Sequence, residues 1–320
     1  MKKIVLIALA TVISLSVAAQ QKEHNYEFTT VKENPITSIK NQFRSGTCWC
    51  YSTLSFLESE VIRIKGEDYK DLDLSDMFIV KNSYYERGIK YVYLDGCLRL
   101  AAGSSAEDVL HVIKDHGIIP ESVYDGFNYG YKLAQQAEVD AVILGFCKAV
   151  VSVPGRGQNL STAWKAGLKG IIDAYFGVAP EKFEYKGKKY TPENFRDALG
   201  IVPDDYISLT SFTHHPFYEQ FVIEVCDNWR WDASYNLPIN EFMAVIDNAI
   251  ENGYTLAWGT DVSEKGFTRN GIALIVDPDA DKKPKAGSDQ EHWTGKAEEA
   301  PQKPLLEDTW EEVTQERRQI

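Results

Sequence analysis

The stretch Asn41-Gln42-Phe43-Arg44-Ser45-Gly46-Thr47-Cys48-Trp49-Cys50-Tyr51-Ser52-Thr53 decides the fold, because it places a thiol where a loop becomes a helix. After Trp49 the apolar residues recur at steps of three and four, and Lys65-Gly66 supplies a basic last turn followed by a stop. The apolar positions are Tyr51, Leu54, Phe56, Leu57, Val61 and Ile64. The sequence therefore predicts that Cys48 lies in the first turn of an amphipathic helix.

The first turn of a helix favours the ionised form of a cysteine. Unpaired amide N–H groups and the positive end of the helix dipole stabilise a thiolate there, and the thiolate is the nucleophilic form. Gly46 lets the backbone approach a substrate closely, and the side-chain amide of Gln42 can donate a hydrogen bond to an oxyanion formed on a carbonyl. We therefore predict Cys48 as a nucleophile and Gln42 as the oxyanion donor. The alternative is a buried structural thiol, since free cysteine is among the most buried residue types.

These residues carry a resemblance to a known family. Gln42…Ser45-Gly46-Thr47-Cys48-Trp49 resembles the active-site segment of papain-like cysteine peptidases, and the pattern Gln-x-x-Ser-Gly-x-Cys-Trp is similar to the bleomycin hydrolase and aminopeptidase C branch. Further segments resemble that branch in the same order, namely residues 74–78, 116–124, 204–209, 227–229, 234–238, 258–262 and 312–318. The resemblance implies an α+β fold with a helical left lobe and a β-rich right lobe, the right lobe being incomplete at the C-terminus.

The resemblance also implies an activity and a substrate site. It implies a cysteine-type peptidase, and within the branch an aminopeptidase that removes residues from peptide N-termini. Papain relatives bind the substrate backbone at a Gly-Gly pair, and Gly103-Ser104 stands in its place here, so Trp49, Gly103 and Ser104 are expected to contact substrate. A homo-oligomer, hexameric in many family members, is implied as well, whereas no metal and no organic cofactor are expected.

A thiol peptidase also needs a histidine to accept the thiol proton and a third group to orient it. In the family the histidine stands at the start of a strand that comes after the Trp-Gly-x-Asp-Val segment, which is residues 258–262 here, and the asparagine stands in Asn-Ser-Trp-Gly. Neither the histidine-bearing strand nor Asn-Ser-Trp-Gly is found before Ile320. We therefore expect that the sequence stops short of this part of the right lobe and that the chain is inactive by itself. The alternative is a peptide-binding pseudoenzyme that ends at Ile320.

Six histidines are present in other contexts. His214 and His215 lie at a sequence distance from Cys48 close to papain spacing, but in a part that resembles a non-catalytic loop of the family. A metal site made of this pair and Glu219 is not expected, because the i, i+4 histidine spacing is missing. Solvated or structural roles are expected for the full set of His24, His111, His116, His214, His215 and His292.

Charge and the N-terminus indicate partners and location. The formal net charge of −13 disfavours nucleic acids and anionic membrane surfaces as partners. Lys2-Lys3, the apolar run Ile4 to Val17 and Ala18-Ala19 predict a signal peptide over residues 1–19. We therefore expect an exported bacterial protein, periplasmic or secreted, without a stable membrane anchor.

The rest of the chain predicts one peptidase domain over residues 20–276, with a helical insertion around 125–200. Residues 277–307 are expected to form a flexible acidic and polar insert, and residues 308–320 to begin the remaining right-lobe segment. Periodicity and turn residues predict helices over 71–87, 103–116, 131–148, 160–176 and 239–252, and another that starts at Thr191-Pro192. The expected caps are Asp73 or Ser75 for the first of these helices and Thr191 for the last, and Gly117 is expected as a left-handed stop after the helix over 103–116. A hairpin is predicted over 183–190, and strands are predicted over 221–226 and 254–259. Cys50 is expected in the core and Cys147 and Cys226 as buried thiols, with one or two disulfides left open among Cys50, Cys97, Cys147 and Cys226.

Overall fold

The structure is a computed structural model that describes residues 28–153 and 159–260. The chain divides into two compact units, Met1–Glu33 and Asn34–Ile320. In the first unit, residues 28–33 have no regular secondary structure. The second unit contains all the elements below. The predicted signal peptide, the insert over 277–307 and the segment over 308–320 lie outside the described residues.

The core is built around the helix that carries Cys48. Helix α2 (Cys48–Lys65) packs against α3 (Asp76–Tyr93) and α4 (Ala106–His116). Apolar side chains of all three helices are fully buried in one cluster, which includes Leu54, Leu57, Val61, Met77, Ile79, Val109, Val112 and Ile113. Each such side chain contributes about 1.5–3 kcal/mol on burial, so this core fixes the direction of α2 and with it the place of its first residue.

Helix α3 begins later than the sequence predicts. The hydroxyl of Ser75 accepts a hydrogen bond from the backbone N–H of Phe78, so Ser75, one of the two predicted caps, is the correct one. The helix then runs to Tyr93, six residues past the predicted end. The preceding residues are not helical because they have tertiary partners. The N–H of Leu74, for example, donates to the buried carboxylate of Glu58 at 2.7 Å.

Helix α4 ends at a glycine that cannot be replaced, because another segment of the backbone packs closely against it. Gly117 has φ 74 and ψ −155, so its φ is positive as predicted, but its ψ is not that of a left-handed helical residue. A Cβ at this position would lie 2.2 Å from the carbonyl carbon of Pro192. Gly117 is therefore required both by its backbone conformation and by close packing.

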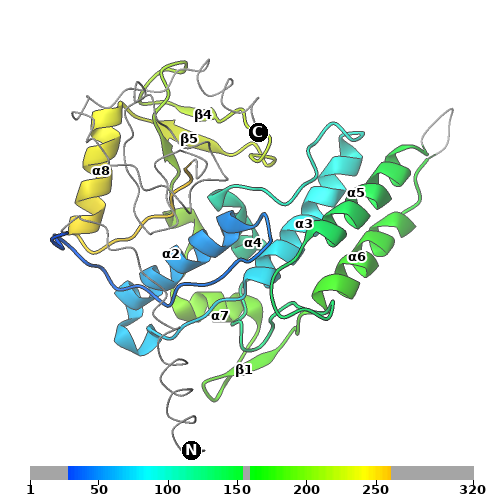
Figure 1. Ribbon diagram of the computed structural model, residues 1–320, viewed down its shortest axis with the longest axis horizontal. Helices are drawn as coiled ribbons and strands as arrows, with labels where there is room; N and C mark the ends of the chain where they lie inside the picture. Colours follow the sequence, from blue (N-terminus) through cyan, green and yellow to red (C-terminus); the bar gives the residue numbers. More distant parts are fainter. Residues whose placement is uncertain (1–27, 154–158, 261–320) are drawn as a thin grey trace, which may run out of the picture. The chain divides into compact units, whose positions relative to one another are not determined.

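The predicted helical insertion consists of α5 (Ala137–Val151) and α6 (Ala163–Phe176), which pack against each other and against α3 (Figure 1). Helix α5 starts six residues later than predicted, because residues 131–136 serve another purpose. The carbonyl of Ala134 accepts the N–H of Arg44 at 3.1 Å. These residues thus support the loop before Cys48.

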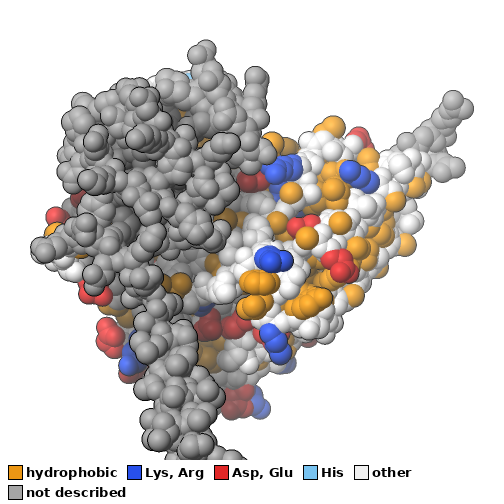
Figure 2. Space-filling view, viewed as in Figure 1, with side chains coloured by type: hydrophobic (Ala, Val, Ile, Leu, Met, Phe, Trp, Pro, Cys, Tyr) orange, Lys and Arg blue, Asp and Glu red, His pale blue; other side chains and the backbone are white. Residues whose placement is uncertain are grey.

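Helix α5 is apolar around much of its circumference. It buries only Val139, Ile143 and Cys147, while Val142 is 37 % exposed. Figure 2 shows exposed hydrophobic side chains over the side formed by α5 and α6, interspersed with polar and charged groups. Within residues 28–153 and 159–260, none of the helices has the length and apolar character of a membrane span.

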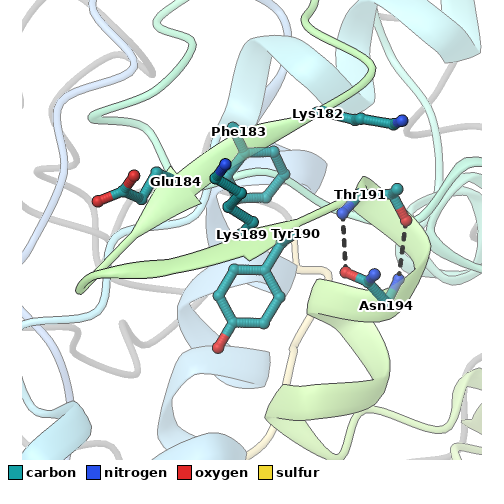
Figure 3. A pocket seen from close by; sticks show the side chains of 7 residues that line it. All are labelled: Lys182, Phe183, Glu184, Lys189, Tyr190, Thr191 and Asn194. Atoms are coloured by element: carbon teal, nitrogen blue, oxygen red, sulfur yellow. Dashed lines mark hydrogen bonds between the residues drawn. The ribbon is translucent and has the colours of Figure 1, made fainter.

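A small hairpin and a short helix follow as predicted. Strands β1 (Phe183–Tyr185) and β2 (Lys188–Tyr190) are antiparallel, and α7 (Pro192–Leu199) follows at once. Thr191 and Asn194 exchange side-chain-to-backbone hydrogen bonds that cap α7 (Figure 3). Phe195 packs edge-on against three rings of the hairpin, with centroid distances of 5.4, 5.2 and 5.1 Å to Phe183, Tyr185 and Tyr190. Two 3₁₀ turns, Glu67–Tyr69 and Pro203–Asp205, complete this part.

The sheet differs most from the prediction. Its order is β3 (Leu209–Thr210), β5 (Ala233–Asn236), β4 (Gln220–Val222), with β5 parallel to β3 and antiparallel to β4. The predicted strand over 221–226 ends at Val222, and the strand predicted over 254–259 is wrong, because these residues have no regular structure. Helix α8 (Ile239–Glu251) matches its predicted range to within one residue.

Candidate active site

Cys48 is the first residue of α2 and is exposed. The preceding Thr47 does not cap the helix with its side chain, since its hydroxyl lies 2.7 Å from that of Ser45 instead. The first turn also holds no acidic residue. The positive end of the α2 dipole therefore faces the sulfur without a neutralising side chain.

The loop before Cys48 holds Gln42 in a fixed position. The amide Nε2 of Gln42 donates to the carbonyl of Ser45 at 2.8 Å, and the hydroxyl of Ser45 donates to the carbonyl of Gln42 at 2.9 Å. A side-chain amide carries two N–H groups, and this contact uses one of them. The second is left for an oxyanion, so the geometry is compatible with the predicted role of Gln42, which stays a prediction.

The same loop contains a strained residue. Phe43 has φ 48, a conformation that a bulky side chain seldom adopts, and its N–H donates to Oδ1 of Asn41 at 2.8 Å. The next residue, Arg44, is tied to Ala134 as described above. Strained backbone of this kind persists where the surrounding structure enforces it, and it is common at functional sites.

Residues 99–104 run beside the nucleophile loop in close contact. A Cβ on Gly46 would lie 2.7 Å from the Cβ of Ala102, so only glycine permits this approach. The indole N–H of Trp49 donates to the carbonyl of Ala102 at 2.9 Å, and Trp49 is only 6 % exposed. Trp49, predicted to contact substrate, therefore supports the segment that carries Gly103 and Ser104, and a direct substrate contact by its ring stays a prediction.

A buried arginine that the sequence analysis missed holds the same segment. Arg87, on α3, donates to the carbonyls of Arg99 and Ala101 at 2.8 Å each and also to that of Gly103. It is 1 % exposed, and burial lowers its pKa, while the nearby carboxylates of Asp227 and Asp108 act in the opposite direction. The Arg87 side chain thus orients the carbonyls of three alternate residues along the segment. The sequence offers no signal for this role beyond an arginine on the apolar side of a helix.

The predicted substrate residue Gly103 lies directly against a carboxylate from the sheet-containing part of the chain. A Cβ on Gly103 would lie 2.7 Å from Oδ2 of Asp227. The other oxygen, Oδ1, is buried and accepts no hydrogen bond from the described residues, and Nη1 of Arg99 lies 3.9 Å from it. Asp227 therefore brings a weakly paired negative charge to this end of the segment, a second feature that the sequence analysis missed.

Ser104 belongs to a buried polar network centred on Asp108. Its hydroxyl donates to Oδ2 of Asp108 at 2.9 Å and accepts the indole N–H of Trp229 at 2.9 Å. Asp108 also binds the hydroxyl of Ser83 and the guanidinium of Arg230. The network joins α3, α4 and the segment over 227–232, so the visible role of Ser104 is to anchor the predicted substrate segment.

All five cysteines are free thiols, so no disulfide forms among them. Cys50 is fully buried as predicted, its sulfur lies 3.4 Å from the carbonyl of Asp76, and burial raises its pKa well above the usual value. Cys147 is also buried, which raises its pKa to about 11. The prediction for Cys226 is wrong, because it is exposed, like Cys97. The apolar run that suggested burial leaves the sheet after Val222.

The four described histidines each lie beside a carboxylate. His111 pairs with Asp232 at 2.7 Å and His116 with Glu86 at 2.5 Å, and these hydrogen bonds raise the pKa of both imidazoles. His214 and His215 contact the two oxygens of Glu224 at 3.4 and 2.8 Å. His24 and His292 lie outside the described residues.

One surface hollow lies on the hairpin and the start of α7 (Figure 3). Its walls are Lys182, Phe183, Glu184, Lys189, Tyr190, Thr191 and Asn194. None of the predicted site residues lines it. The hollow is therefore separate from the nucleophile loop and from the segment over 99–104.

Comparison with known proteins finds similar sequences and similar solved structures. Residues 24–185 match the family described as "Papain family cysteine protease". Cysteine proteinase 2 of Entamoeba histolytica is 28 % identical over 162 residues, which are 50 % of this chain and 46 % of that protein. Aminopeptidase C of Lactobacillus delbrueckii subsp. lactis is 23 % identical over 273 residues, 73 % of this chain and 61 % of that protein. Aminopeptidase E of Lactobacillus helveticus is 22 % identical over 285 residues, 76 % of this chain and 63 % of that protein.

Among solved structures, the crystal structure of pepw from Lactobacillus rhamnosis HN001 superimposes with a TM-score of 0.55 at 20 % identity, covering 71 % of this chain and 59 % of that one. The chain thus spans between 46 % and 63 % of the length of these curated relatives.

Proposed function

Because the chain belongs to the papain family of cysteine proteases, we propose that Cys48 is the nucleophile of a peptidase and that the protein acts as an aminopeptidase. The observation that carries the proposal is the position of Cys48, exposed and first in α2, behind a loop that fixes Gln42. The thiolate attacks the peptide carbonyl, and negative charge develops on the carbonyl oxygen. The free N–H of Gln42 and the amides of the first turn of α2 then stabilise this oxyanion.

The reaction also requires an imidazole to take the thiol proton and return it to the leaving amine. The four described histidines are paired with carboxylates, and we assign this role to none of them. The substrate backbone is expected along residues 99–104, whose carbonyls Arg87 and Trp49 orient. A rigid segment beside the nucleophile would hold the scissile bond close to the sulfur.

Two observations support specificity for peptide N-termini. Relatives that align over about three quarters of this chain are named aminopeptidases. In addition, the partly exposed Asp227 carboxylate lies against Gly103, with Oδ2 nearest to the predicted substrate segment. A free α-ammonium group is the part of a peptide substrate that would pair with such a charge.

The experiment that tests the proposal compares aminoacyl fluorogenic amides with and without an N-acetyl group, using the protein from its native source and recombinant variants of it. We expect the free amine to be hydrolysed with a higher kcat/KM, and Cys48→Ala to abolish hydrolysis. Gln42→Ala should lower kcat on the order of a hundredfold. Asp227→Asn should lower kcat/KM for the free amine on the order of tenfold and leave the acetylated substrate unchanged.

The controls separate the two parts of the proposal. Asp204→Asn, which removes an exposed carboxylate that pairs with Lys114, should leave both rates unchanged. Equal hydrolysis of free and acetylated substrates would show an endopeptidase and would contradict the role of Asp227. Tight peptide binding without any turnover would instead support the pseudoenzyme.

A further inference from the structure

His214, His215 and Glu224 form a compact cluster on the sheet-containing part of the chain. Their potential ligand atoms all lie within 4.8 Å of one another. Nε2 of His214 lies 3.4 Å from Oε2 of Glu224, and Nε2 of His215 lies 2.8 Å from Oε1. The sequence pointed to Glu219 as the acidic neighbour, but the structure brings Glu224 to the two imidazoles instead.

Two imidazoles and a carboxylate are the ligand set of open zinc sites. With metal–ligand bonds near 2.1 Å, ligand atoms around a tetrahedral ion lie about 3.4 Å apart, which matches the distance from His214 to Glu224, while the distance from His215 to Glu224 is shorter. Small rotations of the side chains would therefore admit an ion. We propose that His214, His215 and Glu224 bind a divalent transition-metal ion, with Zn²⁺ as the fitting member of that class.

The imidazole rings are oriented by their aromatic neighbours. The ring of His215 stacks on that of Phe221, with a centroid distance of 4.0 Å and an interplanar angle of 21°. The ring of His214 packs edge-on against Phe221 at 5.7 Å and against Phe212 at 5.4 Å. Both ligands are thus held with Nε2 toward Glu224, and less conformational freedom is lost when an ion binds.

The backbone that carries the two histidines is equally fixed. Asn236, on β5, is fully buried, and its amide donates to the carbonyls of Phe212, His215 and Pro216 at 2.8, 3.0 and 3.2 Å. Its side-chain oxygen accepts the N–H of Phe212 at 2.8 Å. A single side chain of the central strand therefore pins the whole turn. Sites held by such supporting contacts keep the geometry that a metal requires.

The cluster is open to solvent. The side chains of His214, His215 and Glu224 are 19, 30 and 45 % exposed, so an ion can reach them. No further His, Cys, Asp or Glu joins the group within residues 28–153 and 159–260, so water or another small ligand would complete a four-coordinate ion.

The test measures Zn²⁺ binding to the whole protein by calorimetry after its exposed thiols, Cys48, Cys97 and Cys226, have been alkylated with iodoacetamide. Alkylation prevents these sulfurs from binding zinc, and it separates the result from any peptidase activity. We expect one Zn²⁺ per chain. Glu224→Gln and His215→Ala should each weaken binding on the order of tenfold or more.

Matched measurements make the outcome decisive. His111→Ala removes a histidine–carboxylate pair elsewhere and should bind Zn²⁺ like the parent protein. Zinc should raise the thermal midpoint of the parent, because it would connect the turn over 212–216 to Glu224 in the loop after β4, but it should not raise the midpoint of Glu224→Gln. Circular dichroism checks that each variant is folded. No saturable binding to the alkylated parent, or equal affinity in Glu224→Gln and the parent, would overturn the proposal and leave only hydrogen-bonded His–Glu pairs.

Discussion

Cys48 and Cys50 share one turn of α2, and burial gives them different chemistry. Cys48 is exposed at the positive end of the helix, whereas Cys50 is fully buried and its sulfur faces the carbonyl of Asp76. The thiolate is the reactive form, and removal from water disfavours it. Two thiols two residues apart thus have opposite environments.

The first prediction is an order of thiol reactivity. With iodoacetamide under native conditions, Cys48 should be labelled fastest, the exposed Cys97 and Cys226 more slowly, and the buried Cys50 and Cys147 only after unfolding. Peptide mass spectrometry over a time course gives the five rates. Labelling of Cys97 or Cys226 at the rate of Cys48 would contradict an activated thiol.

Arg87 is the second residue whose position affects the site directly, because the carbonyls that it binds belong to the predicted substrate segment. We predict that Arg87→Met lowers the free energy of unfolding by on the order of 3 kcal/mol, since it leaves three partly buried carbonyls without this donor. It should also raise KM more than it lowers kcat, because the segment over 99–104 loses its position. Chemical denaturation and peptidase kinetics provide the two readouts.

Arg99→Met is the matched control for Arg87→Met. Arg99 lies in the same segment, but its side chain is 59 % exposed, so its loss should change stability by only about 0.5 kcal/mol. Arg87→Lys should be intermediate, since a lysine keeps the charge but lacks the planar fork of donors. Equal stability of Arg87→Met and Arg99→Met would show that the three carbonyls do not depend on Arg87.

At the scale of elements, the Asp108 network is the main polar connection between the helices and the segment over 227–232. Asp108 lies on α4 and is fully buried, Ser83 and Glu86 lie on α3, and Arg230 binds both Asp108 and Glu86. The segment also carries Asp227. The network therefore fixes the position of the Asp227 carboxylate relative to Gly103.

The third prediction concerns this junction. Asp108→Asn should destabilise the protein by on the order of 3 kcal/mol, because it removes one of the two carboxylates that pair with the largely buried Arg230. Hydrogen exchange should increase in residues 227–232 more than in α2. Asp204→Asn breaks an exposed pair with Lys114 and should cost less than about 1 kcal/mol. Unchanged exchange in residues 227–232 would argue against the network as the link.

The sequence predicted the helices more accurately than the strands. Ser75 and Thr191 cap α3 and α7 as expected, because a cap is a local interaction between residues close in sequence. Strand β5 was missed, since Ala-Ser-Tyr-Asn has no β-branched residue and its buried positions, Ser234 and Asn236, are polar. The residues that contact these two side chains are distant in the sequence, so no local sequence pattern predicts the contacts.

For the whole molecule, the papain-like α+β fold and the family were predictable because the motif around Cys48 is specific, and the solved structure named above confirms the fold. The support of the site was not predictable. Arg87 and Asp227 act on Gly103 through contacts across the fold, and nothing in their sequence neighbourhoods distinguishes them from ordinary charged residues. The sequence thus indicates the reacting group better than the groups that position it.

The stability of the whole molecule should depend on pH through its buried acids. Burial raises the pKa of Asp76 to about 7 and that of Glu121 to about 8. An acid whose pKa is higher in the folded state binds its proton more tightly there. The stability that each of these acids contributes is therefore fully present below about pH 4, where carboxyl groups of the unfolded chain have their pKa values. This stability is lost as the pH rises through 7 and 8.

The fourth prediction follows from this sign. The thermal midpoint should be higher at pH 5 than at pH 8.5, and Asp76→Asn should reduce the difference, because a neutral amide needs no proton to remain buried. Asp204→Asn, with an exposed side chain, should keep the full difference. A pH dependence that Asp76→Asn leaves unchanged would show that this carboxyl is not the titrating group.

The way in which residues 99–103 are held has an evolutionary consequence. Arg87 and Trp49 bind only main-chain oxygens there, and every amino acid supplies such an oxygen. Most side chains of this segment can therefore diverge between relatives without loss of its path, whereas Arg87 cannot be exchanged so freely. Lineages could thus acquire new substrate preferences by drift at Arg99 and Ala101, and a library at these two codons is the natural place to begin redirecting the protein toward other peptides.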